Sequence, residues 1–270
     1  MSVAAPIERA PAITAAVRTS VRFGPALQVL SVRSIGSAWR DGDLVSGALT
    51  PVIFFVCFYV PLHGQFERSG IDYAQYLTPV ILLQTGLFTA IMAAQNAGID
   101  AAAGVRDRLT SLPISRSVPT LARMSVVIVM SLVSTTGGLI IGAVFGFRFT
   151  ATIFEIAAFV VLVVVFALAL SLLTDALGSV LTNAESVGQA LMIPQLILVM
   201  LSTGIVPAAA FPEWVQPVVR NSPVSQFADA LRALSTGSDF DAFAPIAWAI
   251  GLLLAGAVAA LVVGHRAASR

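Results

Sequence analysis

Six long windows of this chain contain no Asp, Glu, Lys or Arg, and they constrain the fold more than any other feature. They cover residues 44–66, 73–99, 124–147, 156–174, 186–212 and 242–265. A helix that rises about 1.5 Å per residue crosses about 30 Å of hydrocarbon in about 20 residues. An ionisable residue at mid-bilayer costs about 2.5–3.5 kcal/mol, so such windows are rare outside membranes. The sequence therefore predicts an all-α, polytopic membrane protein with six transmembrane helices.

The composition supports this class and excludes others. Charged residues make up 11% of the chain, whereas soluble domains carry about 25%. The net charge of +1 provides no basic surface, so we expect no nucleic-acid partner. Cys57 is the single cysteine, which rules out an internal disulfide and a paired-cysteine metal site. We therefore predict no metal site.

The arginines predict the orientation of the spans. Six spans place both termini on one side, and all fifteen basic residues are Arg. With the termini inside, eleven Arg are cytoplasmic and four, at positions 68, 148, 220 and 232, are outside. This distribution satisfies the positive-inside rule. We therefore expect a multi-pass protein of the bacterial inner (cell) membrane with cytoplasmic N- and C-termini, residues 44–265 forming the membrane domain and 266–270 a cytoplasmic tail.

Residues 1–43 are predicted to form a cytoplasmic tail followed by an interfacial helix. The first apolar window begins too far from the N-terminus to belong to a cleavable signal peptide. From Pro25 to Arg40, an apolar arc contains Leu27, Val32, Ile35, Ala38 and Trp39. Arg33 and Arg40 share the opposite face, which suits the headgroup region of an anionic leaflet.

A polar segment, "DAAAGVRDRLTSLPISRS" at 100–117, separates the second and third windows. Within the predicted cytoplasmic loop 100–119, good helix formers from Gly104 to Leu112 predict a short helix that Pro113 limits. Val105, Leu109 and Leu112 share one face, and Arg106, Asp107 and Arg108 point elsewhere. The segment is either a docking surface for a cytosolic partner or an ordinary solvated loop.

The segment 211–237 before the last window predicts a second short helix. Ser222 can cap it, Pro223 suits its first position, and Gly237 can end it. Its apolar face contains Val224, Phe227, Leu231 and Leu234. The helix is too short to span a membrane, so we expect it at the outer interface. It either caps the bundle or gates an exit path.

Two distant motifs resemble one family. The spacing of Asp100, Gly104, Leu109, Leu112, Pro113 and Arg116 resembles the signature after the second span of ABC-2 type exporter permeases. The stretch "FPEWVQPVVRNSPVSQFADALRAL" at 211–234 resembles their extracellular segment before the last span. With "TPVIFFVCFYVPL" in the first span, the chain is most similar to membrane subunits of daunorubicin-resistance-type exporters of actinobacteria, mycobacterial lipid exporters included.

The resemblance implies a permease subunit of an ATP-driven exporter of a hydrophobic drug or a lipid, such as a complex polyketide lipid. Its partners would be a cytosolic ABC ATPase dimer, which binds ATP and Mg, and a second permease chain, related or identical. The implied ATPase-coupling residues are Asp100, Gly104, Val105, Arg106, Asp107, Arg108, Leu109, Leu112, Pro113 and Arg116. The candidate extracellular gate contains Phe211, Pro212, Trp214, Asn221, Pro223, Phe227, Leu231 and Arg232.

The windows themselves carry little chemistry. They hold no Asp, Glu or Arg, and His63 and His265 lie at their ends. A nucleophile paired with a base, or a metal site, is therefore not predicted, and we expect no catalytic residue. A P-loop needs a lysine, and the chain has none, so we expect it to bind no cofactor and hydrolyse no ATP itself.

Small and polar residues leave two questions open. Gly138, Gly142 and Gly146, with Gly251, Ala255 and Ala259, recur at four-residue spacing, which allows close helix packing. They pack either within the bundle or against a second permease chain. Gln84, Thr85, Gln195, Ser202 and Thr203 make interhelical hydrogen bonds or line a substrate path.

Two other classes share this topology. A secondary transporter needs ionisable groups within the membrane and interrupted helices at matching places, and the sequence shows neither. A membrane scaffold without an ATPase is the second alternative.

Overall fold

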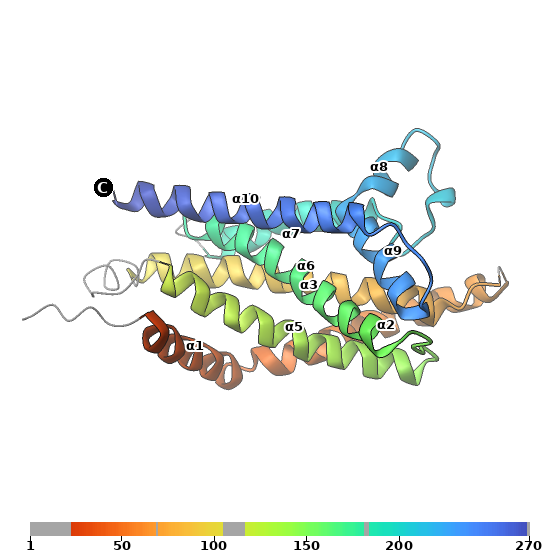
Figure 1. Cartoon of the computed structure of the whole chain (residues 1–270), viewed down its shortest axis with the longest axis horizontal. Coiled ribbons are helices and arrows are strands. Elements are labelled where there is room, and N and C mark those ends of the chain that lie inside the picture. Colours follow the sequence, from red (N-terminus) through yellow and green to blue (C-terminus); the bar gives the residue numbers. More distant parts are fainter. Residues whose placement is uncertain (1–22, 69, 105–116, 181–183, 269–270) are drawn as a thin grey trace, which may run out of the picture.

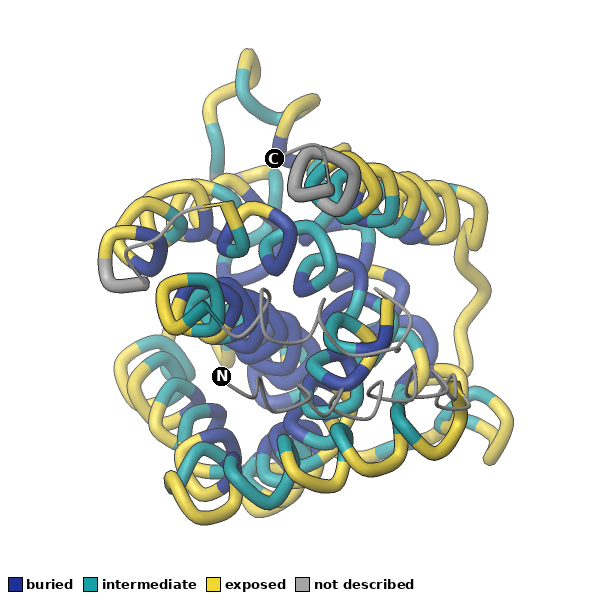
Figure 2. Tube along the Cα trace, turned by 90° about the vertical axis from the view of Figure 1, so that its left-hand side faces the viewer, coloured by how far each residue is buried: buried dark blue, intermediate teal, exposed yellow. Residues whose placement is uncertain are grey.

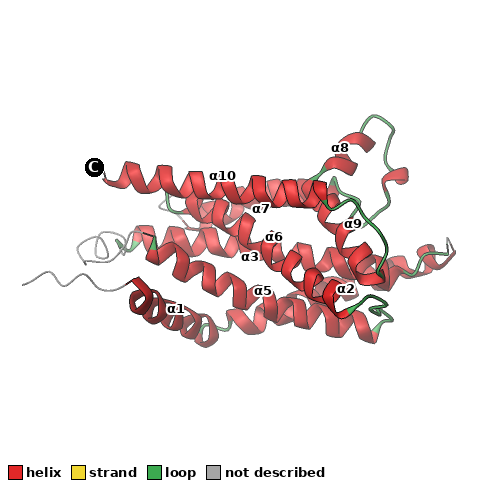
Figure 3. Cartoon of the chain, viewed as in Figure 1, coloured by secondary structure: helices red, strands yellow, loops and turns green. Residues whose placement is uncertain are grey.

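The computed structural model of the chain is a bundle of long helices that run side by side (Figure 1). It describes residues 23–68, 70–104, 117–180 and 184–268, with the backbone alone at 184–185, 210 and 264–268. Throughout these ranges every regular element is a helix (Figure 3). The predicted all-α class is therefore confirmed.

Five helices are long and apolar enough to cross a membrane: α2 (Asp43–Arg68), α3 (Tyr73–Ala102), α5 (Val118–Val144), α6 (Ile153–Gly178) and α10 (Phe243–Ala268). They correspond to five of the six uncharged windows. Most continue past their windows, because a charged residue at the end of a span can reach the headgroup region. α6 thereby includes Asp175, which lay just outside its window.

The fifth window forms a shorter helix than predicted. The span expected over 186–212 is helical only in α7 (Ala184–Met200). Beyond it the chain turns through Gly204 and Pro207, which are poor helix formers, and continues into the 3-10 helix η1 (Ala208–Ala210) and α8 (Gln216–Asn221). Counting uncharged residues could not detect this end, because no charged residue marks it.

α3 is the central helix. Of its most apolar 18-residue window, 78% is buried, compared with 11% for α10. It packs against α2, α5, α6, α7 and α9 (Pro223–Thr236). Viewed along the bundle in Figure 2, buried backbone gathers at the centre and exposed backbone forms the rim.

The glycine stripe of α5 packs inside the bundle. A Cβ added at Gly142 would lie 2.7 Å from Thr78 Oγ1 on α3, and one at Gly138 would meet Leu82. The stripe of α10 behaves differently, because a Cβ at Gly251 would meet nothing within 4 Å. The first stripe therefore supports packing within this chain, whereas Gly251 faces away from it.

α1 (Phe23–Arg40) lies across the end of the bundle, packed on α5 and α2. Ala38 is buried, whereas Val32 and Trp39 are exposed. The predicted apolar arc is thus divided between two surfaces, with one face on the protein. The outward residues leave an apolar surface that a membrane interface can cover.

The close contact at Gly142 predicts a difference between two identical substitutions. Gly142→Leu should lower the free energy of unfolding by about 1–3 kcal/mol, because the new side chain overlaps Thr78. Gly251→Leu, which has the same helix propensity but open space, should have little effect. Thermal unfolding of the purified chain in detergent measures both, and equal melting temperatures would contradict the packing.

Candidate functional site

The bundle has two polar ends. The α1 end contains α1, the C-termini of α3 and α6, and the N-terminus of α5, as Figure 1 shows. The α9 end contains α8, α9 and the irregular chain after α7. Segment 105–116, which holds most of the predicted coupling residues, connects α3 to α5 and therefore belongs to the α1 end by sequence.

Arg123 joins three helices at the α1 end. Its Nε and Nη2 donate to the two carboxylate oxygens of Asp175 on α6, at 2.5 and 3.0 Å. Its Nη1 donates to Asp100 Oδ2 on the last turn of α3, at 3.2 Å. We call Arg123, Asp175 and Asp100 the arginine clasp.

The two halves of the clasp differ in strength. The Asp175 side chain is 3% exposed and is held bidentately, whereas Asp100 is 42% exposed and makes a single contact. Charge-assisted bidentate pairs are the stronger kind, and exposure to water weakens an ion pair. The pair of Arg123 with Asp175 is therefore the firm contact, and its pair with Asp100 is the one that breaks more easily.

Of the predicted coupling residues, Asp100 and Gly104 lie within the described part of the chain. Asp100 is bound to Arg123 rather than free, and Gly104 follows α3 with a left-handed φ of +62° that favours glycine. Val105, Arg106, Asp107, Arg108, Leu109, Leu112, Pro113 and Arg116 lie outside the described residues. Sequence reasoning missed Arg123 and Asp175 as a pair. The sequence did contain a signal for it. Arg123 comes just before the third window and Asp175 just after the fourth, and the predicted topology places these two ends on the same side of the membrane.

At the α9 end, the predicted short helix forms as expected. Ser222 Oγ accepts from the Ser225 N–H at 3.2 Å, Pro223 begins α9, and Gly237 ends it with φ +71° and ψ +26°. Phe227 and Leu231 are fully buried on its apolar face. α9 packs against α3, α6 and α10, so it inserts into the bundle instead of lying on its surface.

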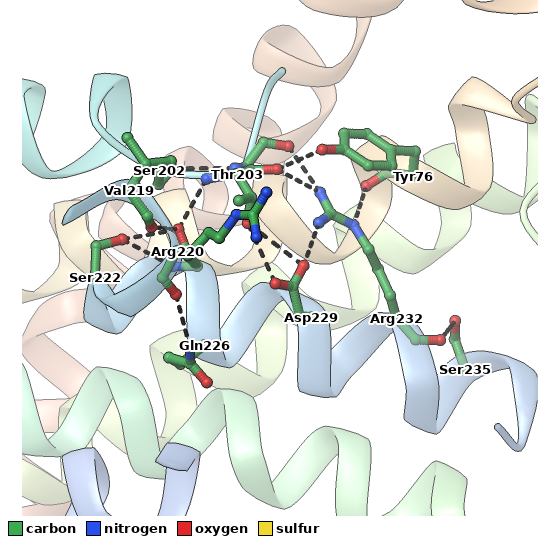
Figure 4. Close-up of polar contacts among 12 residues, drawn as sticks. Tyr76, Ser202, Thr203, Val219, Arg220, Ser222, Gln226, Asp229, Arg232 and Ser235 are labelled. Carbon is green, nitrogen blue, oxygen red and sulfur yellow. Dashed lines mark hydrogen bonds and ion pairs between the residues drawn. The ribbon is translucent and has the colours of Figure 1, made fainter. Parts of the chain in front are cut away.

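Arg232 ties α9 to the end of α7 (Figure 4). Its Nη2 donates to the carbonyls of Thr203 at 3.1 Å and Gly204 at 2.8 Å, and its Nε donates to the Tyr76 carbonyl at 3.2 Å. The guanidinium also lies 3.6 Å from the centre of the Tyr76 ring. A helix end leaves carbonyls without intrahelical partners, and the planar guanidinium carries enough donors to serve several of them. Arg232 thus holds the irregular chain that follows α7 against α3 and α9.

Thr203 is held from two further sides. The Tyr76 hydroxyl donates to its carbonyl at 2.5 Å, and Ser225 Oγ accepts from its N–H at 2.8 Å. Asp229 in turn accepts from Arg232 Nη1 at 2.8 Å. The α9 end is therefore closed by a connected polar network that spans α3, α7 and α9.

The structure gathers only some of the predicted gate residues. Pro223, Phe227, Leu231 and Arg232 belong to α9 and its contacts. Asn221 Nδ2 donates to Pro217 O within α8, and the Phe211 carbonyl accepts from Gln216 Nε2. Trp214 is 82% exposed, near Pro212 in the loop between η1 and α8. The first four close the bundle, and the other four belong to α8 and the loop before it.

The residues predicted to line a substrate path do not form one cluster either. Thr85 and Ser202 donate to carbonyls of their own segments, at Leu82 and Val199, and Thr203 belongs to the outer network. The side-chain oxygens of Gln84 on α3 and Gln195 on α7 are buried and have no hydrogen-bond partner in the described part of the chain. An unpaired buried polar atom costs about 1–3 kcal/mol. These two residues therefore remain candidates to contact a ligand.

The chain matches the family model for the ABC-2 type transporter over residues 25–235. It belongs to the ABC-2 type transporter family. It is 33% identical over 235 residues to the doxorubicin resistance ABC transporter permease protein DrrB of Mycobacterium tuberculosis, covering 84% of this chain and 81% of that protein. It is also similar to the probable permease protein DrrC of that organism, at 26% identity over 268 residues, or 97% and 96% of the two chains. Daunorubicin resistance permease protein DrrB1 of Streptomyces coeruleorubidus is 26% identical over 212 residues, or 78% and 73%.

Family membership and the apolar helices together identify a multi-pass membrane protein, the transmembrane permease subunit of an ABC exporter. Permeases of this kind work with an ATPase partner. The resemblance found in the two motifs is thereby confirmed. The matched residues include both the arginine clasp and the Arg232 network, so the family's core covers both polar ends.

The clasp predicts that removing one of its buried charges lowers the stability of the folded chain more than removing both Arg123 and Asp175. Arg123→Leu should destabilise the chain by about 3–5 kcal/mol, because Asp175 stays buried without its partner. Adding Asp175→Leu should recover most of this loss, since both charges are then gone. Thermal unfolding in lipid nanodiscs measures the series, with exposed Arg220→Leu as the control. Equal destabilisation of the single and double variants would argue against the pair.

Proposed function

We propose that this chain is the non-catalytic subunit of an ATP-driven exporter that moves a hydrophobic substrate outward across the bacterial inner membrane. The observation that carries the proposal is the arginine clasp, which links the two helices flanking segment 105–116 to α6. The names of the relatives favour a hydrophobic drug as substrate. A lipid, such as a complex polyketide lipid, is the second candidate.

The energy would come from a cytosolic ABC ATPase dimer that binds ATP and Mg. This chain contains no lysine and hence no P-loop of its own. A second permease chain, identical or related, would complete the membrane domain. The exposed face of α10 around Gly251 offers room for close helix packing with such a chain.

Segment 100–117 would receive the motion of the ATPase. A displacement of the segment acts first on Asp100, which is its first residue and the last polar side chain of α3. Asp100 pulls on Arg123, and Arg123 is firmly held by Asp175 on α6. α6 packs against α3, α9 and α10, so the motion reaches the opposite end through packed helices.

At the far end, α9 would act as the outer gate. Opening it requires breaking contacts of Arg232 with the Thr203 and Gly204 carbonyls. Those carbonyls belong to the irregular chain that follows α7. Gln84 and Gln195, on the packed pair α3 and α7, would contact the substrate on its way.

This function requires the α1 end to face the cytoplasm and the α9 end to face outward. In a Cys57→Ser background, Trp214→Cys should react with an impermeant maleimide on intact cells, because residue 214 is exposed in the outer loop. Arg33→Cys on α1 should react only after the cells are opened. The reverse pattern would invert the topology and remove the proposed direction of transport.

The coupling role predicts different outcomes for apolar and charged positions of the segment. Leu109→Asp with Leu112→Asp should abolish co-purification of the ATPase or uncouple its activity from export, because apolar anchors at an interface core contribute most of the binding energy. Arg106→Ala should do less, as expected for a rim charge. ATPase and export assays on the reconstituted complex, with the melting temperature as a folding control, measure both. Full export by the double variant would leave the segment as a solvated loop.

A further inference from the structure

A cavity of about 330 Å³ lies at the α1 end, between α1, α3 and α5. Asp41, on the turn after α1, and Asp43, the first residue of α2, line it together with Asp100 on α3. Ligand pockets in proteins have volumes of about 300–1,000 Å³, so this one accommodates a small headgroup with part of its attached body.

The lining carries an excess of negative charge. Its single cationic side chain is Arg123, which is already engaged by Asp175 and Asp100. Among the described residues, Asp41 and Asp43 form no ion pair, and Asp41 accepts only from Ser37 Oγ, at 2.9 Å. A cation therefore gains attraction in this cavity, whereas a phosphate or carboxylate is repelled.

Another part of the lining is apolar. Met92 on α3, with Val127 and Met130 on α5, contributes flexible and branched hydrocarbon, and methionine adapts readily to different ligand shapes. α1 beside the cavity presents Val32 and Trp39 outward, which places the site at the level of a membrane interface. An amphiphile lying in that interface holds its charge at headgroup level and its apolar part deeper.

A bound metal ion explains the cavity less well. In the described residues, no group of three or more His, Cys, Asp or Glu side chains is placed to hold one. The three carboxylates of the lining therefore do not converge on a single point. This distribution suits a bulky organic cation with an apolar body.

We propose that this cavity binds a cationic amphiphile, with its positive group facing Asp41 and Asp43 and its apolar part against Met92, Val127 and Met130. This binding proposal rests on the proposed function only where it treats the amphiphile as an export substrate. Bound there, the cation competes with Arg123 for Asp100, whose single 3.2 Å contact is the weaker half of the clasp. Occupancy of the cavity and release of Asp100 are then linked.

Binding is tested by cysteine protection, using the whole chain in lipid nanodiscs without ATPase. A Cys57→Ser, Ser34→Cys variant carries its only thiol at the cavity lining. A Gln28→Cys variant carries the thiol on the exposed side of α1 and reports changes in membrane surface charge. The probes are three matched amphiphiles: trimethylammonium-diphenylhexatriene, uncharged diphenylhexatriene and diphenylhexatriene propionate.

The cationic probe should slow alkylation of residue 34 by N-ethylmaleimide relative to residue 28, and the neutral and anionic probes should do so weakly or not at all. Asp41→Asn with Asp43→Asn should weaken the apparent affinity for the cationic probe about tenfold, because two charge-assisted contacts are lost. Glu213→Gln with Asp239→Asn, which changes the charge equally at the α9 end, should leave it unchanged. Melting temperatures confirm that each variant is folded.

Equal protection by all three probes would overturn the proposal, as would protection that survives the loss of Asp41 and Asp43. Absence of protection by any probe would do the same. Because the assay contains neither ATPase nor transport, a failure of the proposed function leaves its result intact. Conversely, if the chain couples to an ATPase but does not bind the cation, the proposed binding site is wrong and the proposed function is unaffected.

Discussion

Hydrocarbon offers no water to a polar group, and both ends of this bundle are organised around an arginine that meets this constraint. Arg123 neutralises a buried carboxylate at the α1 end. Arg232 supplies donors to the Thr203 and Gly204 carbonyls in the irregular chain at the α9 end. Without the first, Asp175 would be a buried charge. Without the second, the Gly204 carbonyl would lose its charged donor.

Both arginines bind the same helix. Arg123 contacts Asp100 at the C-terminus of α3, and Arg232 contacts Tyr76 near its N-terminus. α3 is also the most buried of the long helices. A single rigid element therefore touches the segment proposed to meet the ATPase and the helix proposed to gate the exit. This arrangement gives the two ends a direct mechanical connection.

The sequence predicted those features that depend on residues close together in the chain. The uncharged windows located the long helices, and the Ser222, Pro223 and Gly237 pattern gave the bounds of α9 within the chain. The end of α7 was missed because no charged residue marks it, and the contacts that hold the chain after it come from Arg232, about thirty residues further along. The clasp was missed for the same reason, since Arg123 and Asp175 become neighbours only when α5 and α6 pack. Residues 105–116 lie outside the described chain, so the coupling helix remains a prediction.

The contact between α3 and α6 has a consequence for the route of any cargo. A Cβ on Gly178 would collide with the Ala94 carbonyl, and Thr174 Oγ1 donates to the Ala90 carbonyl at 2.6 Å. Two helices whose backbones meet this closely leave no seam that a bulky molecule can part. α3 and α6 therefore form a fixed frame, and transport has to proceed by moving shorter pieces around it. The shorter helix α7 packs against α3 of this frame with one face and is exposed on the other, so it can move together with α9, the proposed gate.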